Sequence, residues 1–204
     1  MTTDADYARA VAYLDKTRLP AYVSFIEKTA ARGLGDDREA PRRLYVRMPD
    51  GVIVRGTPPG EVHVVGTNNG DSDNPFRKER MYEPRCYTPT SETRTQLHGS
   101  PALRFALQSA CTDTMDFTEL YADPETLRPI AVDGNVADTD GSHMTTASEV
   151  RYATVGPYTV PSGLSAHAVG HGWLFWARER VEVTYTDYRF FEAAKFNRRQ
   201  ASEP

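Results

Sequence analysis

Short runs in which apolar and polar residues alternate, each followed by turn residues, make up most of the chain after its first twenty residues. In RRLYVRM (42–48) every second residue from Leu44 is apolar, and Pro-Asp-Gly at 49–51 leads into a second run, VIVRG (52–56). A period of two is typical of β-strands, and proline and glycine favour the turn between them. We therefore expect a hairpin over 42–56. The other runs of this kind are 21–29, 61–66, 93–99, 102–110, 116–122, 128–138, 147–155, 158–169 and 174–190.

The order of these runs predicts the fold class. Strand follows strand at short spacing, with turns such as DPET (123–126) and TDGS (139–142), and no helix separates them. This is typical of an antiparallel meander and excludes a parallel βαβ sheet. We expect a mainly β (α+β) protein with one domain, 1–204, built as a strongly curved antiparallel sheet.

One segment has helical periodicity instead. Tyr7, Val11 and Leu14 are spaced for one face of a helix over 4–18, and Pro20 ends it. We expect this helix to cover the concave face of the sheet.

An irregular loop is expected over 67–92. It begins with the polar sequence TNNGDSDNP, and Pro75, Pro84 and Pro89 interrupt any period. A short second helix around 76–82 is compatible with this sequence. Loops of this length are often functional.

The last strand changes its pattern partway. In VEVTYTDYRFF (181–191) the apolar residues shift by one position after Thr186-Asp187. A bulge or bend re-aims a strand in this way. We expect strong curvature here, with the strand passing from one environment to another.

The composition and the absence of certain motifs limit the classes of function that we expect for this chain. The chain has 204 residues, 39% of them hydrophobic, and a formal net charge of −4. Its basic pairs are short, so we expect no nucleic acid partner. GxSxG, P-loop and GxGxxG motifs are absent, and we expect no cofactor. The opening MTTDADY lacks the apolar segment of a signal peptide, although a trimmed signal would leave the same start.

Two cysteines, Cys86 and Cys111, leave two interpretations open. An even count allows a disulfide, which would add roughly 3 kcal/mol in the chain-entropy model. Alternatively, both are unpaired cysteines in or near a core.

Histidines are the main catalytic candidates. His167 and His171 have the HxxxH spacing of a zinc pair on a helix, but their segment is predicted to be a strand, where they could not share one metal. We therefore expect no metal site. An enzyme would instead use His98, His143, His167 or His171 near the 67–92 loop, and two histidines and a carboxylate in one cleft would support it.

Aromatic residues come from many of the predicted strands. They would form an ordinary core, or they would line an apolar gap between sheet and helix that binds an apolar ligand. Chosen by alternation alone, the expected lining is Phe25, Leu44, Val46, Val64, Phe105, Leu107, Phe117, Tyr152, Trp176, Val183 and Tyr185.

Three segments resemble a known family. FTELYADPETLRPI (117–130), EVRYATVGPYTVPSGLSAHAV (149–169) and VEVTYTDYRFF (181–191) are similar to strands of the LolA-like superfamily of periplasmic lipoprotein carriers and related lipid-binding proteins of bacterial envelopes. The resemblance implies an unclosed, strongly curved antiparallel barrel (a half-barrel) with helices plugging its mouth. It also implies export to the periplasm or envelope and a bridge between the two cysteines. Some carriers of this superfamily use a single arginine to hold a lid closed, and we assign that role to no arginine of this chain.

The first hypothesis is non-catalytic binding or transport of a hydrophobic, lipid-like ligand such as an acyl chain. Peripheral contact with a membrane is compatible with it, and the oligomeric state is open. The alternatives are an envelope scaffold domain with a filled core and an enzyme with a histidine-containing site.

Overall fold

The computed structural model describes residues 3–14, 22–33, 35–39, 43–47, 52–56, 62–67, 86–110, 115–136, 144–172 and 175–191. These residues form one helix, α1 (Thr3–Ala12), and a series of strands. The strands are β1 (Tyr22–Gly33), β2 (Gly35–Glu39), β3 (Arg43–Arg47), β4 (Val52–Gly56), β5 (Val62–Thr67), β6 (Tyr87–Leu97), β7 (Ser100–Ser109), β8 (Met115–Ala122), β9 (Pro129–Val136), β10 (Met144–Val155), β11 (Tyr158–Gly172) and β12 (Phe175–Phe191).

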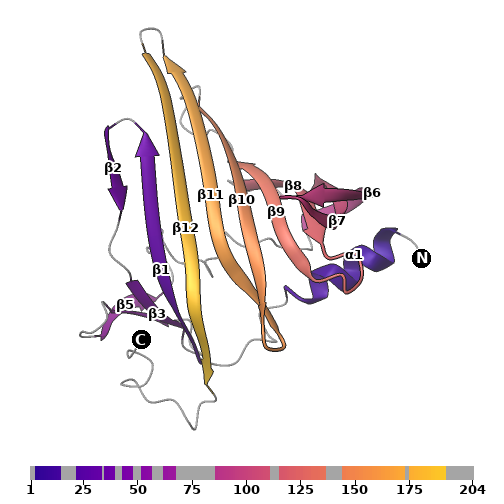
Figure 1. The fold of residues 1–204 in the computed structure, drawn as a ribbon, viewed down its shortest axis with the longest axis horizontal. Helices are drawn as coiled ribbons and strands as arrows, with labels where there is room; N and C mark the ends of the chain where they lie inside the picture. The colour runs from indigo at the N-terminus through magenta and orange to yellow at the C-terminus, as the bar shows by residue number, and fades with distance from the viewer. Residues whose placement is uncertain are drawn as a thin grey trace.

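All strands belong to one 12-stranded antiparallel sheet. Its order is β5-β4-β3-β1-β12-β11-β10-β9-β8-β7-β6, with β2 paired to β1 beside that path. Figure 1 shows β1, β12, β11 and β10 side by side, while β6, β7 and β8 run across their direction. The predicted mainly β fold, a curved and unclosed antiparallel sheet with an N-terminal helix, is confirmed.

The local turn chemistry follows the sequence. β3 and β4 form the hairpin predicted over 42–56. Between β8 and β9, Asp123 Oδ1 accepts hydrogen bonds from the backbone N–H groups of Glu125 at 3.1 Å and Thr126 at 2.7 Å. The Thr126 hydrogen bond is the main cause that lowers the pKa of Asp123. This Asx turn is the one predicted from DPET.

The N-terminal helix is shorter than predicted. It ends at Ala12, and the N–H groups of Tyr13 and Leu14 bond to the carbonyls three residues earlier, at 3.2 Å and 2.9 Å. Such bonds tighten a helix end, so Tyr13 and Leu14 form a turn instead of helix. Residues 15–18 of the predicted helix lie outside the described residues.

The prediction of an irregular loop was wrong for 87–92, which belong to β6. Pro89 is tolerated because β6 is the edge of the sheet, and a bulge lies between Pro89 and Ser91. The short helix considered at 76–82 and the turn at 139–142 lie outside the described residues. β2, which folds back on β1, was not predicted from the sequence.

The pattern shift in β12 is a bulge, as predicted. Ser24 pairs with Arg189 and Ile26 with Thr186, so two residues of β12 lie opposite Phe25 alone. Asp187, one of the two, has a φ of 55°, the left-handed conformation found in bulges with an added residue. We expected β12 to pass into a second environment at this point, and that prediction was wrong. The inserted residue keeps the apolar side chains before and after the bulge on the same face of the sheet. Tyr188 packs with the same cluster as Tyr185.

Helix α1 covers one face of the sheet, called here the helix face. Tyr7 and Ala10 of α1 pack with buried residues of the strands, including Phe105, Val132 and Val150, in the main core. The Tyr7 and Phe105 rings meet edge to face with centroids 5.8 Å apart. Residues that alternate with these, such as Glu119, Asp133 and Glu149, point to the opposite face, called here the charged face.

Candidate functional site

The predicted ligand-lining residues divide into three groups. Phe105, Phe117 and Tyr152 are buried in the core under α1, and Leu107 packs against that core. Phe25, Val183 and Tyr185 are buried in a second cluster. The side chains of Leu44, Val46, Val64 and Trp176 lie outside the described residues. The predicted residues that the structure describes therefore do not line one cavity.

The second cluster extends into a row of rings, called here the aromatic row. Phe25 meets Tyr185 edge to face with centroids 5.7 Å apart and stacks on Tyr188 at 5.4 Å. Tyr188 stacks on Phe190 at 6.2 Å, and Phe190 meets Tyr158 at 4.6 Å. Tyr188, Phe190 and Tyr158 are only partly buried, so the row presents ring surface.

Leu164 connects the two clusters. It packs partly buried against both the core under α1 and the cluster of Phe25. Its cross-strand neighbours, Val150 and Val183, belong one to each cluster. The aromatic row is therefore a continuation of the helix face beyond the part that α1 packs on.

Alternation predicted two members of this row, Phe25 and Tyr185, but excluded Tyr188 and Phe190, because a regular strand would place them on the other face. Tyr158 was not in the predicted lining either. The missed signal is a phase shift of one residue between two apolar runs, which indicates a bulge that keeps both runs on one face.

The charged face carries three carboxylates on neighbouring strands. Glu119 of β8 lies opposite Asp133 of β9, and Asp133 lies opposite Glu149 of β10. Like charges directly opposite each other destabilise a sheet unless other groups compensate.

Basic groups compensate two of the three carboxylates. Glu119 forms an ion pair with Arg104 and accepts a hydrogen bond from the Tyr121 hydroxyl. Glu149 Oε2 lies 2.8 Å from His98 Nε2, and its Oε1 lies 3.7 Å from Arg151 Nε.

The third carboxylate, Asp133, binds a proton more readily than an ordinary aspartate. Burial, followed by the charges of Glu149 and Glu119, raises the pKa of Asp133 to about 6. Within the described part of the chain, its Oδ1 is buried without a hydrogen-bond partner.

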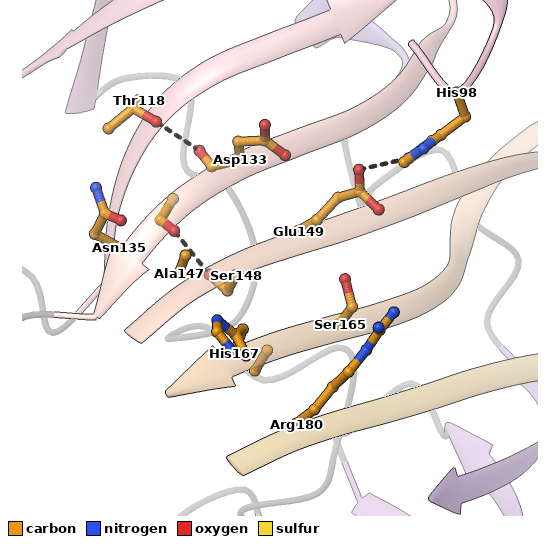
Figure 2. Close-up of a pocket in the computed structure, with 12 residues that line it drawn as sticks. His98, Thr118, Asp133, Asn135, Ala147, Ser148, Glu149, Ser165, His167 and Arg180 are labelled. Atoms are coloured by element: carbon orange, nitrogen blue, oxygen red, sulfur yellow. Dashed lines mark hydrogen bonds and ion pairs between the residues drawn. The ribbon is translucent and has the colours of Figure 1, made fainter. Parts of the chain in front are cut away.

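A shallow groove of about 610 Å³ crosses the charged face here. Figure 2 shows His98, Asp133 and Glu149 toward one side and His167 and Arg180 toward the other. His98 reaches the groove because the two-residue turn His98–Gly99, with φ of 50° and 83°, ends the β6–β7 hairpin there.

Two histidines, His98 and His167, and two carboxylates, Asp133 and Glu149, thus line one groove. We named such a combination above as support for an enzyme. Their arrangement is that of an ion-pair surface: His98 bonds to Glu149. Among the described residues, His167 makes no hydrogen bond to Ser165, although both lie on one face of β11. In the same residues, no group of three His, Cys, Asp or Glu side chains could hold a metal ion.

The side chains of His171 and His143 lie outside the described residues. The backbone of His171 is at the end of β11, so the HxxxH pair lies on a strand as predicted. His143 lies outside the described residues. No helix that the structure describes is long and apolar enough to span a membrane.

Cys86 is buried at 5% exposure and takes part in a disulfide. Its carbonyl accepts a hydrogen bond of 2.7 Å from the N–H of Ala110, the residue before Cys111. Cys111 itself lies outside the described residues, so the Cys86–Cys111 bridge stays a prediction.

Comparisons with known proteins were made by sequence and by structure. No family model and no curated protein matches the sequence. A LolA superfamily protein from Nitrosomonas europaea is similar in structure, with 10% identity, a TM-score of 0.47 and 94% of each chain covered. A DUF1329 family protein from Desulfovibrio piger has 10% identity, a TM-score of 0.47 and 98% of each chain covered. The structure of MucB in complex with MucA(peri) has 11% identity and a TM-score of 0.22, covering 93% of this chain and 99% of that one.

Proposed function

We propose that this protein binds a hydrophobic, lipid-like ligand without catalysis, and that the ligand lies on the aromatic row. The observation that carries the proposal is the partly buried state of Tyr188, Phe190 and Tyr158. These rings are held by contacts with one another and with buried Phe25, and part of the surface of each is exposed to solvent. An apolar chain laid on them would gain about 25 cal/mol for each Å² of apolar surface removed from water.

The core under α1 is a less suitable place for the ligand. Phe105 and Leu120 are fully buried there, and Tyr7 of the helix packs on Phe105. A ligand in this region would have to displace α1 and expose that core, which costs the contacts it replaces.

We place this binding in the bacterial envelope. Segments 117–130, 149–169 and 181–191 resemble envelope lipid carriers, and the disulfide at Cys86 suits an oxidising compartment. Cell fractionation, with a cytoplasmic enzyme as marker, tests this placement separately from binding.

The binding test is a fluorescence titration with cis-parinaric acid, a fluorescent fatty acid. Wild-type protein should bind it saturably, and Phe190→Ser and Tyr188→Ser should each weaken binding about tenfold, because each removes an aromatic contact surface. Leu97→Ser is the matched control, since Leu97 is a partly buried apolar residue of the separate cluster around Ala102 and Tyr121. The absence of saturable binding to the wild type, or an equal loss in all three variants, would contradict the proposal.

A further inference from the structure

A second pocket lies on the charged face, on the other side of the sheet from the aromatic row. Its volume is about 470 Å³, and the described residues that line it are Ala30, Arg32, Arg151, Arg180 and Glu182. Three arginines face one glutamate, so the lining has two positive charges in excess. It adjoins the groove of Figure 2, which Arg180 also lines.

Strand register brings two of these arginines together. Arg32 of β1 pairs directly with Arg180 of β12. Directly opposed residues of an antiparallel pair share a face with their Cβ atoms about 4.5–5.5 Å apart, where like charges repel. The same register places His167 next to Arg180 on the other side. Basic side chains therefore follow one another on three strands, and Glu182 is the one carboxylate of the pocket lining that offsets them.

The third arginine passes over a glycine. A Cβ at Gly163 would lie 2.7 Å from Arg151 Nη2, so the guanidinium would have to shift if this residue had a side chain. Across this gap, Arg151 Nη2 donates a hydrogen bond of 3.2 Å to Glu182 Oε2. The guanidinium is therefore positioned before any ligand arrives.

The one carboxylate of the pocket is already saturated. Glu182 Oε1 accepts hydrogen bonds from Arg180 Nε at 3.0 Å and Nη2 at 2.7 Å, while Oε2 accepts from Arg151. Among the residues that the structure describes, Arg32 has no hydrogen-bond or ion-pair partner. Two guanidiniums held by Glu182, beside a third that is bound by none of the described residues, form an arrangement suited to an anion with several acceptor oxygens.

We propose that the pocket of Arg32, Arg151 and Arg180 binds a phosphate group. A guanidinium has a planar set of donors that matches phosphate geometry, and phosphate oxygens can accept from more than one arginine at once. The group is either a free phosphate or phosphate monoester, or the headgroup of an anionic phospholipid. This site is separate from the apolar site proposed above and does not depend on it.

The test is calorimetric titration of the full chain with inorganic phosphate at constant ionic strength. Arg32→Gln should weaken phosphate binding about tenfold, because it removes the free guanidinium and its charge-assisted hydrogen bonds. Arg32→Lys should give an intermediate loss. Arg94→Gln is the control with the same charge change, since Arg94 is exposed on β6 at the far end of the sheet order.

Flotation with phosphatidylglycerol and phosphatidylcholine vesicles distinguishes the two sources. If the protein floats only with phosphatidylglycerol, and both Arg32→Gln and added phosphate release it, the phosphate belongs to a lipid headgroup. Phosphate binding that depends on Arg32 without flotation assigns the site to a free phosphate or monoester. No binding of inorganic phosphate to the wild type, or equal losses in Arg32→Gln and Arg94→Gln, would overturn the proposal.

Discussion

The rings of Phe25 and Tyr188 stack with centroids 5.4 Å apart and planes inclined by 30°. Tyr188 reaches Phe25 because Asp187 takes a left-handed conformation and adds one residue to β12 opposite Phe25. A regular strand would point Tyr188 to the charged face. The bulge therefore builds the aromatic row, and with it the proposed ligand surface.

The first prediction concerns the conformation of Asp187. Asp187→Val should lower the free energy of unfolding by about 1–3 kcal/mol, because a β-branched residue is strained at positive φ. Asp187→Gly and Asp187→Asn should be nearly neutral, since both residues adopt this conformation readily. Urea denaturation of the three variants measures the difference. Equal stability of the valine and glycine variants would contradict the role of the bulge.

The fold was largely predictable because its signals are local. Alternation and turn residues define hairpins such as 42–56 and the Asx turn at Asp123, and these depend on few distant contacts. The phase shift at Thr186-Asp187 also predicted a bulge. Its consequence was misjudged, since sequence alone does not say whether an inserted residue changes the face or restores it.

The candidate sites were less predictable because they depend on strand register. Arg32 and Arg180 are far apart in sequence, and only the pairing of β1 with β12 makes them neighbours. The facing of Glu119 and Asp133 likewise depends on a bulge between Phe117 and Glu119 in β8. Pro89 was taken as a strand breaker, and only its place on an edge strand explains why β6 contains it.

The second prediction is a pH dependence caused by Asp133. Its pKa of about 6 in the folded protein exceeds the usual value near 3.8, so its contribution to stability is lost as pH rises from about 4 to above 6. Burial and the charges of Glu149 and Glu119 raise the pKa of Asp133, while His98 and a hydrogen bond from Tyr121 lower it.

The variant Asp133→Asn should remove this effect. It should match the wild type at pH 4 and exceed it at pH 8 by on the order of 1 kcal/mol, allowing for screening by water. Thermal unfolding from pH 4 to 8 measures this. A difference between variant and wild type that does not grow with pH would contradict the raised pKa.

The third prediction concerns Gly163. Gly163→Ala should destabilise the protein by about 1–3 kcal/mol, because the new Cβ would lie 2.7 Å from Arg151 Nη2 and 2.9 Å from the Val183 carbonyl oxygen. A double-mutant cycle with Arg151→Ala separates the two contacts, since only the backbone clash remains without the arginine. Strict additivity of the two substitutions would show that Arg151 does not cross this glycine.

The fourth prediction separates the filled core from the ligand surface. Phe105→Leu should cost on the order of 1 kcal/mol of stability, because Phe105 is fully buried against Tyr7. It should leave the affinity for cis-parinaric acid unchanged, since the core under α1 is not the proposed site. A loss of affinity comparable to that of Phe190→Ser would instead place the ligand between α1 and the sheet.

The most direct measurement is native mass spectrometry of the protein purified from cells, compared with its mass after organic extraction. The proposed function predicts an extractable apolar mass of lipid size bound to the wild type and absent from the Phe190→Ser variant. A wild-type protein without bound mass, unchanged after incubation with fatty acids and phospholipids, would contradict hydrophobic-ligand binding and direct attention to His98 and His167 in the groove of the charged face.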